Sequence, residues 1–316
     1  MIRLYFLQAF YHLRENPIIT WVSILGTAMA ICMIMVLVIT FQVRLVDCEP
    51  EVNRSRTLYV PYMSVKQKGN SDNESANASM SVRTGRECFR ALSMPEAVTL
   101  ASGVYRVRAS VPSRSKATAD MVQTDEAFWT IFSFHFLSGE AFTKADCDAG
   151  LTRAVLDATT ARRLFGTTDA VGRTVQLDYV DYTVAGVVAD VSMLATAAYA
   201  QIWVPYTAAG AEAMSWQNDT MGPMHAIILA RSSADFDAIR EETELLRKKY
   251  NDGLQDIEVF YRGQPDTQLA YLYRRWYAEP DVPGVMLRYA IVVIILLLVP
   301  AVNLSGMTLS RMRRRM

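Results

Sequence analysis

The sequence is poor in the residues that build metal and nucleophile sites. Its 316 residues contain three histidines and four cysteines. No histidine lies three or four positions from another histidine or from a cysteine, so the spacing predicts no metal site. The phosphate-cradling pattern GxxxxGK[ST] and the nucleophile pattern GxSxG are also missing. We therefore expect no catalytic residue, no bound metal and no cofactor, and any ATP would be used by a separate subunit.

Excess charge of either sign is absent as well. The chain has 32 Lys and Arg against 32 Asp and Glu, which gives no indication of a nucleic-acid partner. The cysteines at positions 32, 48, 88 and 147 match no disulfide framework. Unpaired thiols are favoured, with a Cys88–Cys147 bridge left open. The acidic cluster Asp146-Cys147-Asp148 is interpreted as a solvated loop in preference to a calcium site.

What the sequence does have is two long uncharged runs. The first covers Ile18–Val43, 26 residues, whereas roughly 20 residues cross the hydrocarbon core of a bilayer as a helix. It exceeds the about 7–15 apolar residues of a cleaved signal peptide. Asn16 and Pro17 are typical of a helix start. We predict transmembrane helix 1 over residues 18–43, preceded by an amphipathic interfacial helix over residues 1–17.

The second uncharged run covers Ala290–Ser310 and contains Pro300. We predict transmembrane helix 2 over residues 289–310, after a stalk over residues 263–288 whose aromatic residues suit the membrane–water boundary. A basic end, residues 311–316, follows. Five arginines lie close to the presumed inner ends and two to the outer ends: Arg14, Arg311, Arg313, Arg314 and Arg315 against Arg44 and Arg288.

The excess of arginines next to the inner ends places both termini in the cytoplasm and about 245 residues outside the inner membrane. Only charges close to the spans are counted, because long domains cross the membrane largely regardless of charge. Including Arg54, Arg56, Arg274 and Arg275 brings the count near parity. Within the first span, small residues recur at helical spacing and mark a candidate helix–helix contact. They are Ser23, Gly26, Thr27 and Ala30.

The outer part mixes strand and helix patterns and predicts an α+β fold. We expect one α+β lobe over residues 44–116 and 223–262, and an inserted strand-rich lobe over residues 117–222. In the first lobe, LYVPYMSV (residues 58–65) predicts a strand, and Ser93 with Glu96 predicts a capped helix running to about Ser102. Aromatic residues between 128 and 142 are interpreted as core.

One stretch resembles a known family. The run AVLDATTARRLFG…DAVGRTVQLDYVDYTVAGVVADV…IWVP is similar to the periplasmic core region of MacB/FtsX-type ABC transporter permeases. The family's pattern of a short strand, a helix ending in glycine, a turn glycine and an alternating strand is matched by eleven residues. These are Ala161, Arg162, Leu164, Phe165, Gly166, Gly172, Thr183, Val184, Gly186, Val187 and Asp190.

The resemblance implies a non-catalytic permease subunit in the bacterial inner membrane. It would couple ATP hydrolysis by a cytoplasmic ATP-binding cassette ATPase to movement of periplasmic lobes acting on a peptide, small molecule or lipoprotein. The implied partners are that ATPase, a second permease copy, a periplasmic adaptor and the lipid bilayer. Such permeases usually carry two further spans, so the chain looks like part of a four-span permease. The alternative is a two-span sensory receptor with a ligand-binding periplasmic domain.

Overall fold

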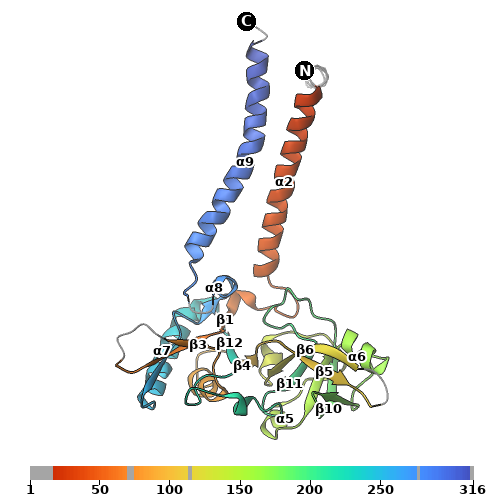
Figure 1. Ribbon diagram of the computed structural model, residues 1–316, viewed down its shortest axis with the longest axis vertical. Helices are drawn as coiled ribbons and strands as arrows, with labels where there is room; N and C mark the ends of the chain where they lie inside the picture. Colours follow the sequence, from red (N-terminus) through yellow and green to blue (C-terminus); the bar gives the residue numbers. More distant parts are fainter. Residues whose placement is uncertain (1–16, 70–74, 113–115, 276–277, 314–316) are drawn as a thin grey trace. The chain divides into compact units, whose positions relative to one another are not determined.

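The computed structural model describes residues 17–69, 75–112, 116–275 and 278–313. The chain divides into two compact units (Figure 1). One contains Met1–Arg44 with Asp281–Met316, and the other, here called the head, is Leu45–Pro280. The predicted interfacial helix lies outside the described residues except for Pro17. So do three of the arginines of the orientation count, Arg14, Arg314 and Arg315.

The first unit consists of two long apolar helices, α2 (Pro17–Leu45) and α9 (Val282–Arg313). The segments Thr20–Leu45 and Val282–Val302 each have a mean hydropathy of 2.7 and are long enough to cross a membrane. Both fit the predicted spans, although α9 begins inside the predicted stalk and continues through Pro300. Large apolar side chains along both helices are exposed to the surroundings. The pattern is that of helices hydrophobic all round.

The described residues of the head form three sheets. A four-stranded sheet has the order β14 (Asp266–Thr267), β1 (Thr57–Val60), β12 (Met224–Leu229), β4 (Ala97–Ser102). A three-stranded sheet has the order β13 (Ile257–Phe260), β2 (Met63–Gln67), β3 (Ala76–Ala78). With α3 (Val82–Gly85), η2 (Arg86–Arg90), α7 (Phe236–Asp252) and α8 (Gln268–Tyr273), they form what we call the first lobe.

The third sheet forms the second lobe. Its order is β7 (Phe136–Gly139), β10 (Val180–Val188), β8 (Arg153–Asp157), β11 (Ile202–Pro205), β6 (Lys116–Thr124), β5 (Tyr105–Ser110), β9 (Thr174–Leu177). Because β9 pairs with both β5 and β10, six of these strands close into a ring. The lobe also holds α4 (Phe128–Ile131), α5 (Lys144–Asp148) and α6 (Ala158–Phe165).

Alternation along the strands builds three apolar cores. In β1, Leu58 and Val60 face a core of the first lobe, whereas Tyr59 faces a second core shared with the other lobe. In β11, Ile202 and Val204 face the core of the second lobe, and Trp203 faces the shared core. Successive side chains of a strand point to opposite faces. The shared core therefore lies between the four-stranded sheet and the outer face of the strand ring, and it holds the predicted aromatic cluster around Phe128.

The predicted helix over residues 93–102 is wrong. Residues 97–102 form β4, which pairs antiparallel with β12 along its whole length. The capping side chains are used elsewhere, since Ser93 donates to Glu242 at 2.7 Å and Glu96 pairs with Arg56. The β-branched residues of this segment and its two buried faces outweigh the local cap signal. The strand expected over residues 58–65 is interrupted at Pro61 and supplies β1 and β2 to two different sheets.

Both predicted boundaries of the inserted lobe, 116/117 and 222/223, need correction. Strand β5 pairs with β6 and β9 and so belongs to the second lobe, although residues up to 116 were assigned to the first. At the other end, Tyr206, Ala211 and Met221 pack in the core of the first lobe. By strand pairing and packing, the insertion runs from about β5 to β11.

Other local predictions agree with the structure. Helix α6 ends at Gly166, whose φ of 78° is the left-handed conformation that glycine tolerates. The mixture of helices and strands confirms the α+β class. Cys88 and Cys147 are free thiols buried in two different cores, so the Cys88–Cys147 alternative is not realised.

Candidate functional site

The head is joined to the apolar helices by two segments, and these carry its most deeply buried ion pairs. We call residues 45–56 the N-linker and residues 262–275 with 278–280 the C-linker. Each contains an arginine paired with a carboxylate that is at most 3% exposed. Each also contains a cis peptide bond before proline, at Pro50 and Pro265. Buried charges of this kind require a partner, because an isolated one is costly to desolvate.

In the N-linker, Arg54 donates from Nε to Glu51 at 2.6 Å. The rest of its guanidinium reaches two carbonyls, Nη1 to Val46 at 2.8 Å and Nη2 to Leu194 at 2.9 Å. The second carboxylate oxygen of Glu51 accepts the backbone N–H groups of Ala197 at 2.7 Å and Ala198 at 3.0 Å. Four of these five bonds leave the pair, and three end in the loop between β10 and β11.

Other bonds of the N-linker also end in the second lobe. The Pro50 carbonyl accepts from the Ser133 N–H at 2.9 Å, and the Asn53 amide donates to the Ile131 carbonyl at 3.2 Å. The N-linker is therefore bonded to the loop after β10 and to the region of α4 before it continues into β1 of the first lobe.

The C-linker is bonded mainly to the first lobe and to itself, and its Tyr271 side chain also bonds Thr196 in the loop between β10 and β11. Arg274 contacts both carboxylate oxygens of Asp266, with Nη2 at 2.8 Å from Oδ1, and donates to the carbonyls of Arg262 at 3.0 Å and Ala278 at 3.3 Å. Burial raises the pKa of Asp266, and its bonds with Arg274 oppose that effect. Arg240 of α7 donates to the Pro265 carbonyl at 3.1 Å.

The two linkers meet in one sheet. Strand β14 of the C-linker pairs antiparallel with β1, which directly follows the N-linker, with Leu58 opposite Thr267 and Tyr59 opposite Asp266. The rings of Tyr59 and Tyr271 stack with centroids 4.5 Å apart and planes 15° apart. Both connections to the apolar helices thus enter the head through adjacent strands.

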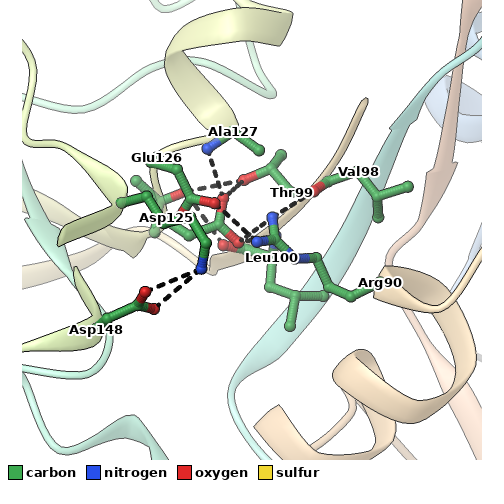
Figure 2. A network of polar contacts seen from close by, with 10 residues as sticks. Arg90, Val98, Thr99, Leu100, Asp125, Glu126, Ala127 and Asp148 are labelled. Atoms are coloured by element: carbon green, nitrogen blue, oxygen red, sulfur yellow. Dashed lines mark hydrogen bonds and ion pairs between the residues drawn. The ribbon is translucent and has the colours of Figure 1, made fainter. Parts of the chain in front are cut away.

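A buried polar network joins the two lobes (Figure 2). Asp125, directly after β6 of the second lobe, accepts from the Thr99 hydroxyl at 2.6 Å and the Leu100 N–H at 3.1 Å, both on β4 of the first lobe. Arg90 of η2 donates to Asp125 at 3.3 Å, to Glu126 at 2.8 Å and to the Val98 carbonyl at 2.8 Å. Burial raises the pKa of Asp125 to about 6, against the opposing effects of Arg90 and of its hydrogen bonds.

The small residues of the first span share the least exposed face of α2. Ser23 and Ala30 are buried, and Gly26 and Thr27 are half-buried, while Val22, Ile24 and Leu25 beside them are exposed. Short side chains beside long ones let another helix approach closely. A helix–helix contact at this face stays a prediction.

The eleven family-pattern residues lie together in the second lobe. Ala161, Leu164 and Phe165 of α6 pack in its core with Val184 and Val187 of β10. Asp190, just after β10, accepts from the backbone N–H and the hydroxyl of Thr159, both at 2.8 Å, and so holds the first turn of α6. The others of the eleven are Arg162, whose carbonyl accepts from Gly166, then Gly172 in a turn, and Thr183 and Gly186 on β10.

The carboxylates of the acidic cluster Asp146-Cys147-Asp148 are bonded to other groups of the chain. Asp146 caps α5 through the backbone and hydroxyl of Thr143, and Asp148 pairs with Lys144 at 2.9 Å. Within the part of the chain that the structure describes, no group of three or more His, Cys, Asp or Glu side chains could hold a metal ion.

Sequence reasoning missed the two ion pairs. Arg54 and Arg274 were counted among charges flanking the membrane, but the structure buries both. The i, i+3 spacing of Glu51 and Arg54 was an available local signal. Nothing local marks the pairing of Asp266 with Arg274, eight residues apart, because the turn formed by β14 and α8 brings them together.

Comparison with known proteins bears on this arrangement. A search among curated proteins found no match. Two examples represent the solved structures that are similar. One is the extracellular domain of the noncanonic ABC-type transporter YknZ from Gram-positive bacteria, with 16% identity, a TM-score of 0.43, and coverage of 63% of this chain and 99% of that chain. The other is the periplasmic region of MacB from Actinobacillus actinomycetemcomitans, with 17% identity, a TM-score of 0.45, and coverage of 65% and 90%.

The sequence profile described as MacB-like periplasmic core domain matches residues 20–246. The match extends from α2 through both lobes into α7 and includes all eleven family-pattern residues. It confirms the resemblance given by those residues. The chain belongs to the family of proteins with a MacB-like periplasmic core domain.

Proposed function

We propose that this chain is the non-catalytic permease subunit of an ABC-type exporter or mechanotransmission complex. Membership of the family supports a transporter-type role in the inner membrane with a periplasmic domain. ATP is hydrolysed by a separate cytoplasmic ATPase, and the chain itself binds no cofactor. Both termini are cytoplasmic, and the head lies in the periplasm. Two permease copies pair, with a periplasmic adaptor as a further partner.

The arrangement of the linkers is the observation that carries the proposal. Most hydrogen bonds of the N-linker go to the second lobe, in particular to the loop after β10, with Arg56 also bonded to Glu96 and Ala230 of the first lobe. The C-linker is bonded mainly to the first lobe. A displacement of α2 relative to α9 is thereby transmitted to different lobes. Buried ion pairs with several hydrogen bonds make these connections stiff. The lobes then act on a peptide, a small molecule or a lipoprotein.

Thermodynamic linkage makes the coupling reciprocal. If ATP binding by the partner ATPase changes the arrangement of the lobes, a ligand that prefers one arrangement must change the affinity for ATP by the same factor. A two-span receptor would show a response to its ligand without any ATPase.

The test is purification of the tagged full-length chain together with candidate ABC ATPases from the same genome, followed by reconstitution in nanodiscs. Spin labels at exposed residues Val180 of the second lobe and Leu245 of α7 report the distance between the lobes. We expect a stable complex whose label distance changes on addition of ATP and vanadate. Failure of every ATPase to bind would contradict the proposal, and a ligand-driven change without an ATPase would favour the receptor.

A further inference from the structure

The loop between β10 and β11 has an unusual composition and an exposed apolar tip. Residues 191–201, VSMLATAAYAQ, contain no charged side chain. Met193 is 71% exposed and Leu194 is 50% exposed. Adjacent large apolar side chains held in the open are typical of an interaction surface.

The loop is fixed in place by the N-linker ion pair. One guanidinium, that of Arg54, bonds the Leu194 carbonyl at 2.9 Å and the Val46 carbonyl at 2.8 Å. Glu51 accepts the N–H groups of Ala197 and Ala198 on the other side of the tip. Val46 is itself 59% exposed. The ion pair therefore holds the backbone at Val46 and at Leu194 to one guanidinium, and the exposed apolar side chains of Val46, Met193 and Leu194 belong to these two segments.

The chain determines where this group lies along the membrane normal. Val46 directly follows Leu45, the last residue of the apolar segment Thr20–Leu45. That segment has 26 residues, and about 20 residues suffice to cross the hydrocarbon core, so its end reaches the headgroup region. The Leu194 carbonyl is bonded to the same guanidinium as the Val46 carbonyl, so the tip is held beside Val46.

The geometry points to a lipid-binding tip: we propose that Val46, Met193 and Leu194 insert into the interfacial layer of the outer leaflet. The proposal rests on the proposed function in one respect, that α2 spans the bilayer with the head in the periplasm. The attraction is apolar, because the basic side chains of the N-linker are already used, Arg54 in its buried pair with Glu51 and Arg56 with Glu96. Contact should therefore depend little on anionic lipid or on salt.

The consequence concerns how a movement of α2 would be transmitted to the second lobe. The loop that shares three hydrogen bonds with the N-linker would also be held by lipid. The position of the second lobe would then be set by the membrane surface as well as by α2. A change in the depth or tilt of α2 would then act on the end of β10, directly after the family-pattern residues Gly186 and Val187.

The experiment measures depth by spin-label accessibility in the full-length chain. In a Cys32→Ala, Cys48→Ser background, the remaining thiols of Cys88 and Cys147 are buried and do not react. A label at Leu194→Cys is compared with one at Val180→Cys, which is 46% exposed and at the other end of β10. At about 3.3 Å per residue the two strand ends are roughly 26 Å apart. Proteoliposomes of pure phosphatidylcholine and of equimolar phosphatidylcholine and phosphatidylglycerol are used.

We expect the ratio of oxygen to nickel-chelate collisions to be several-fold higher at position 194 than at position 180, and equal in the two lipids. A Met193→Asp substitution should lower the ratio at position 194, with the melting temperature unchanged. Equal ratios at positions 194 and 180 would overturn the proposal. Protection of position 194 from both reagents would also overturn it, in favour of docking by a protein.

Discussion

The N-linker and the C-linker each connect an apolar helix to the head, but they do so through different contacts. Both hold a buried arginine against a buried carboxylate. Arg54 and Glu51 send most of their remaining bonds across to the second lobe, to Leu194, Ala197 and Ala198. Arg274 uses its remaining bonds within its own linker, which is attached to the first lobe through β14.

The difference shows how two parallel connections can move two lobes. If both linkers were bonded to one lobe, a relative displacement of the helices would be resisted by that lobe alone. Because each is bonded mainly to a different lobe, under the proposed function the displacement would reach the shared core and the Asp125 network between them. Cores are close-packed and respond by repacking between discrete arrangements more readily than by continuous deformation.

The largest expected effect is loss of either buried arginine. Arg54→Met leaves Glu51 buried without its cation, and Arg274→Met does the same to Asp266, so each should lower the free energy of unfolding by about 3–5 kcal/mol. The exposed pair of Lys144 with Asp148 is the matched control, and Lys144→Met should leave the free energy of unfolding nearly unchanged. Thermal unfolding of the full-length chain in detergent measures all three.

Hydrogen exchange then separates the two arginines. Arg54→Met should increase exchange at the Ala197 and Ala198 amides, which Glu51 holds, whereas Arg274→Met should leave these amides protected. Equal exchange of the second lobe in both variants would show that the linkers do not differ in the lobe that they contact.

The second expected effect is a pH dependence at the junction of the lobes. Burial raises the pKa of Asp125 from 3.8 to about 6, so between these values the folded protein binds more protons than the unfolded chain. Stability from this group is therefore present below about pH 4 and is lost as the pH rises to about 6. The free energy of unfolding of the wild type, relative to that of Asp125→Asn, should fall by about 3 kcal/mol across that window.

Denaturant unfolding followed by tryptophan fluorescence, to which buried Trp203 contributes, measures both proteins on either side of the window. The Asn side chain lacks one acceptor, which adds an offset that does not change with pH. The free energy of unfolding of the wild type relative to Asp125→Asn would instead increase with pH if Arg90, Thr99 and the backbone donors stabilised the carboxylate more than burial opposes it.

The sequence could predict elements whose signal is local. Helix α6 was predicted from its pattern and its terminal Gly166, and the two spans from their length and lack of charge. The family pattern was readable because Asp190 and Thr159, although 31 residues apart, belong to one β–α–turn–β unit.

What could not be predicted depends on tertiary contacts. Residues 97–102 carry a helix cap before them, yet they form β4 because β12 pairs with every residue of the segment. Strand β5 was assigned to the wrong lobe because its partners β6 and β9 are known only from the fold. The linker ion pairs were read as exposed charges, since burial of an arginine is decided by carbonyls such as that of Leu194, 140 residues away.

A third prediction tests the pairing of β7 with β10 in the second lobe. The loop after β10 is the one that is bonded to the N-linker. A Cβ at Gly186 of β10 would lie 2.6 Å from the Glu140 carbonyl oxygen, which is backbone and cannot turn away. Gly186→Ala should therefore destabilise the head by about 1–3 kcal/mol. Gly103→Ala is the control, because nothing lies within 4 Å of a Cβ there. An unchanged melting temperature for Gly186→Ala would mean that β7 and β10 can separate at no cost.

The smallest expected effect is at the contact where the linkers meet. The stacked rings of Tyr59 and Tyr271 should contribute about 0.5–1.5 kcal/mol beyond the area that they bury. A double-mutant cycle of Tyr59→Leu and Tyr271→Leu isolates this coupling energy from the cost of truncating each ring. Tyr59→Phe keeps the stack and removes a buried hydroxyl that has no hydrogen-bond partner among the described residues, so it should be neutral or slightly stabilising. A coupling energy near zero would leave the pairing of β1 with β14 as the connection between the linkers, and the transmission of strain between them would then have to pass through the backbone.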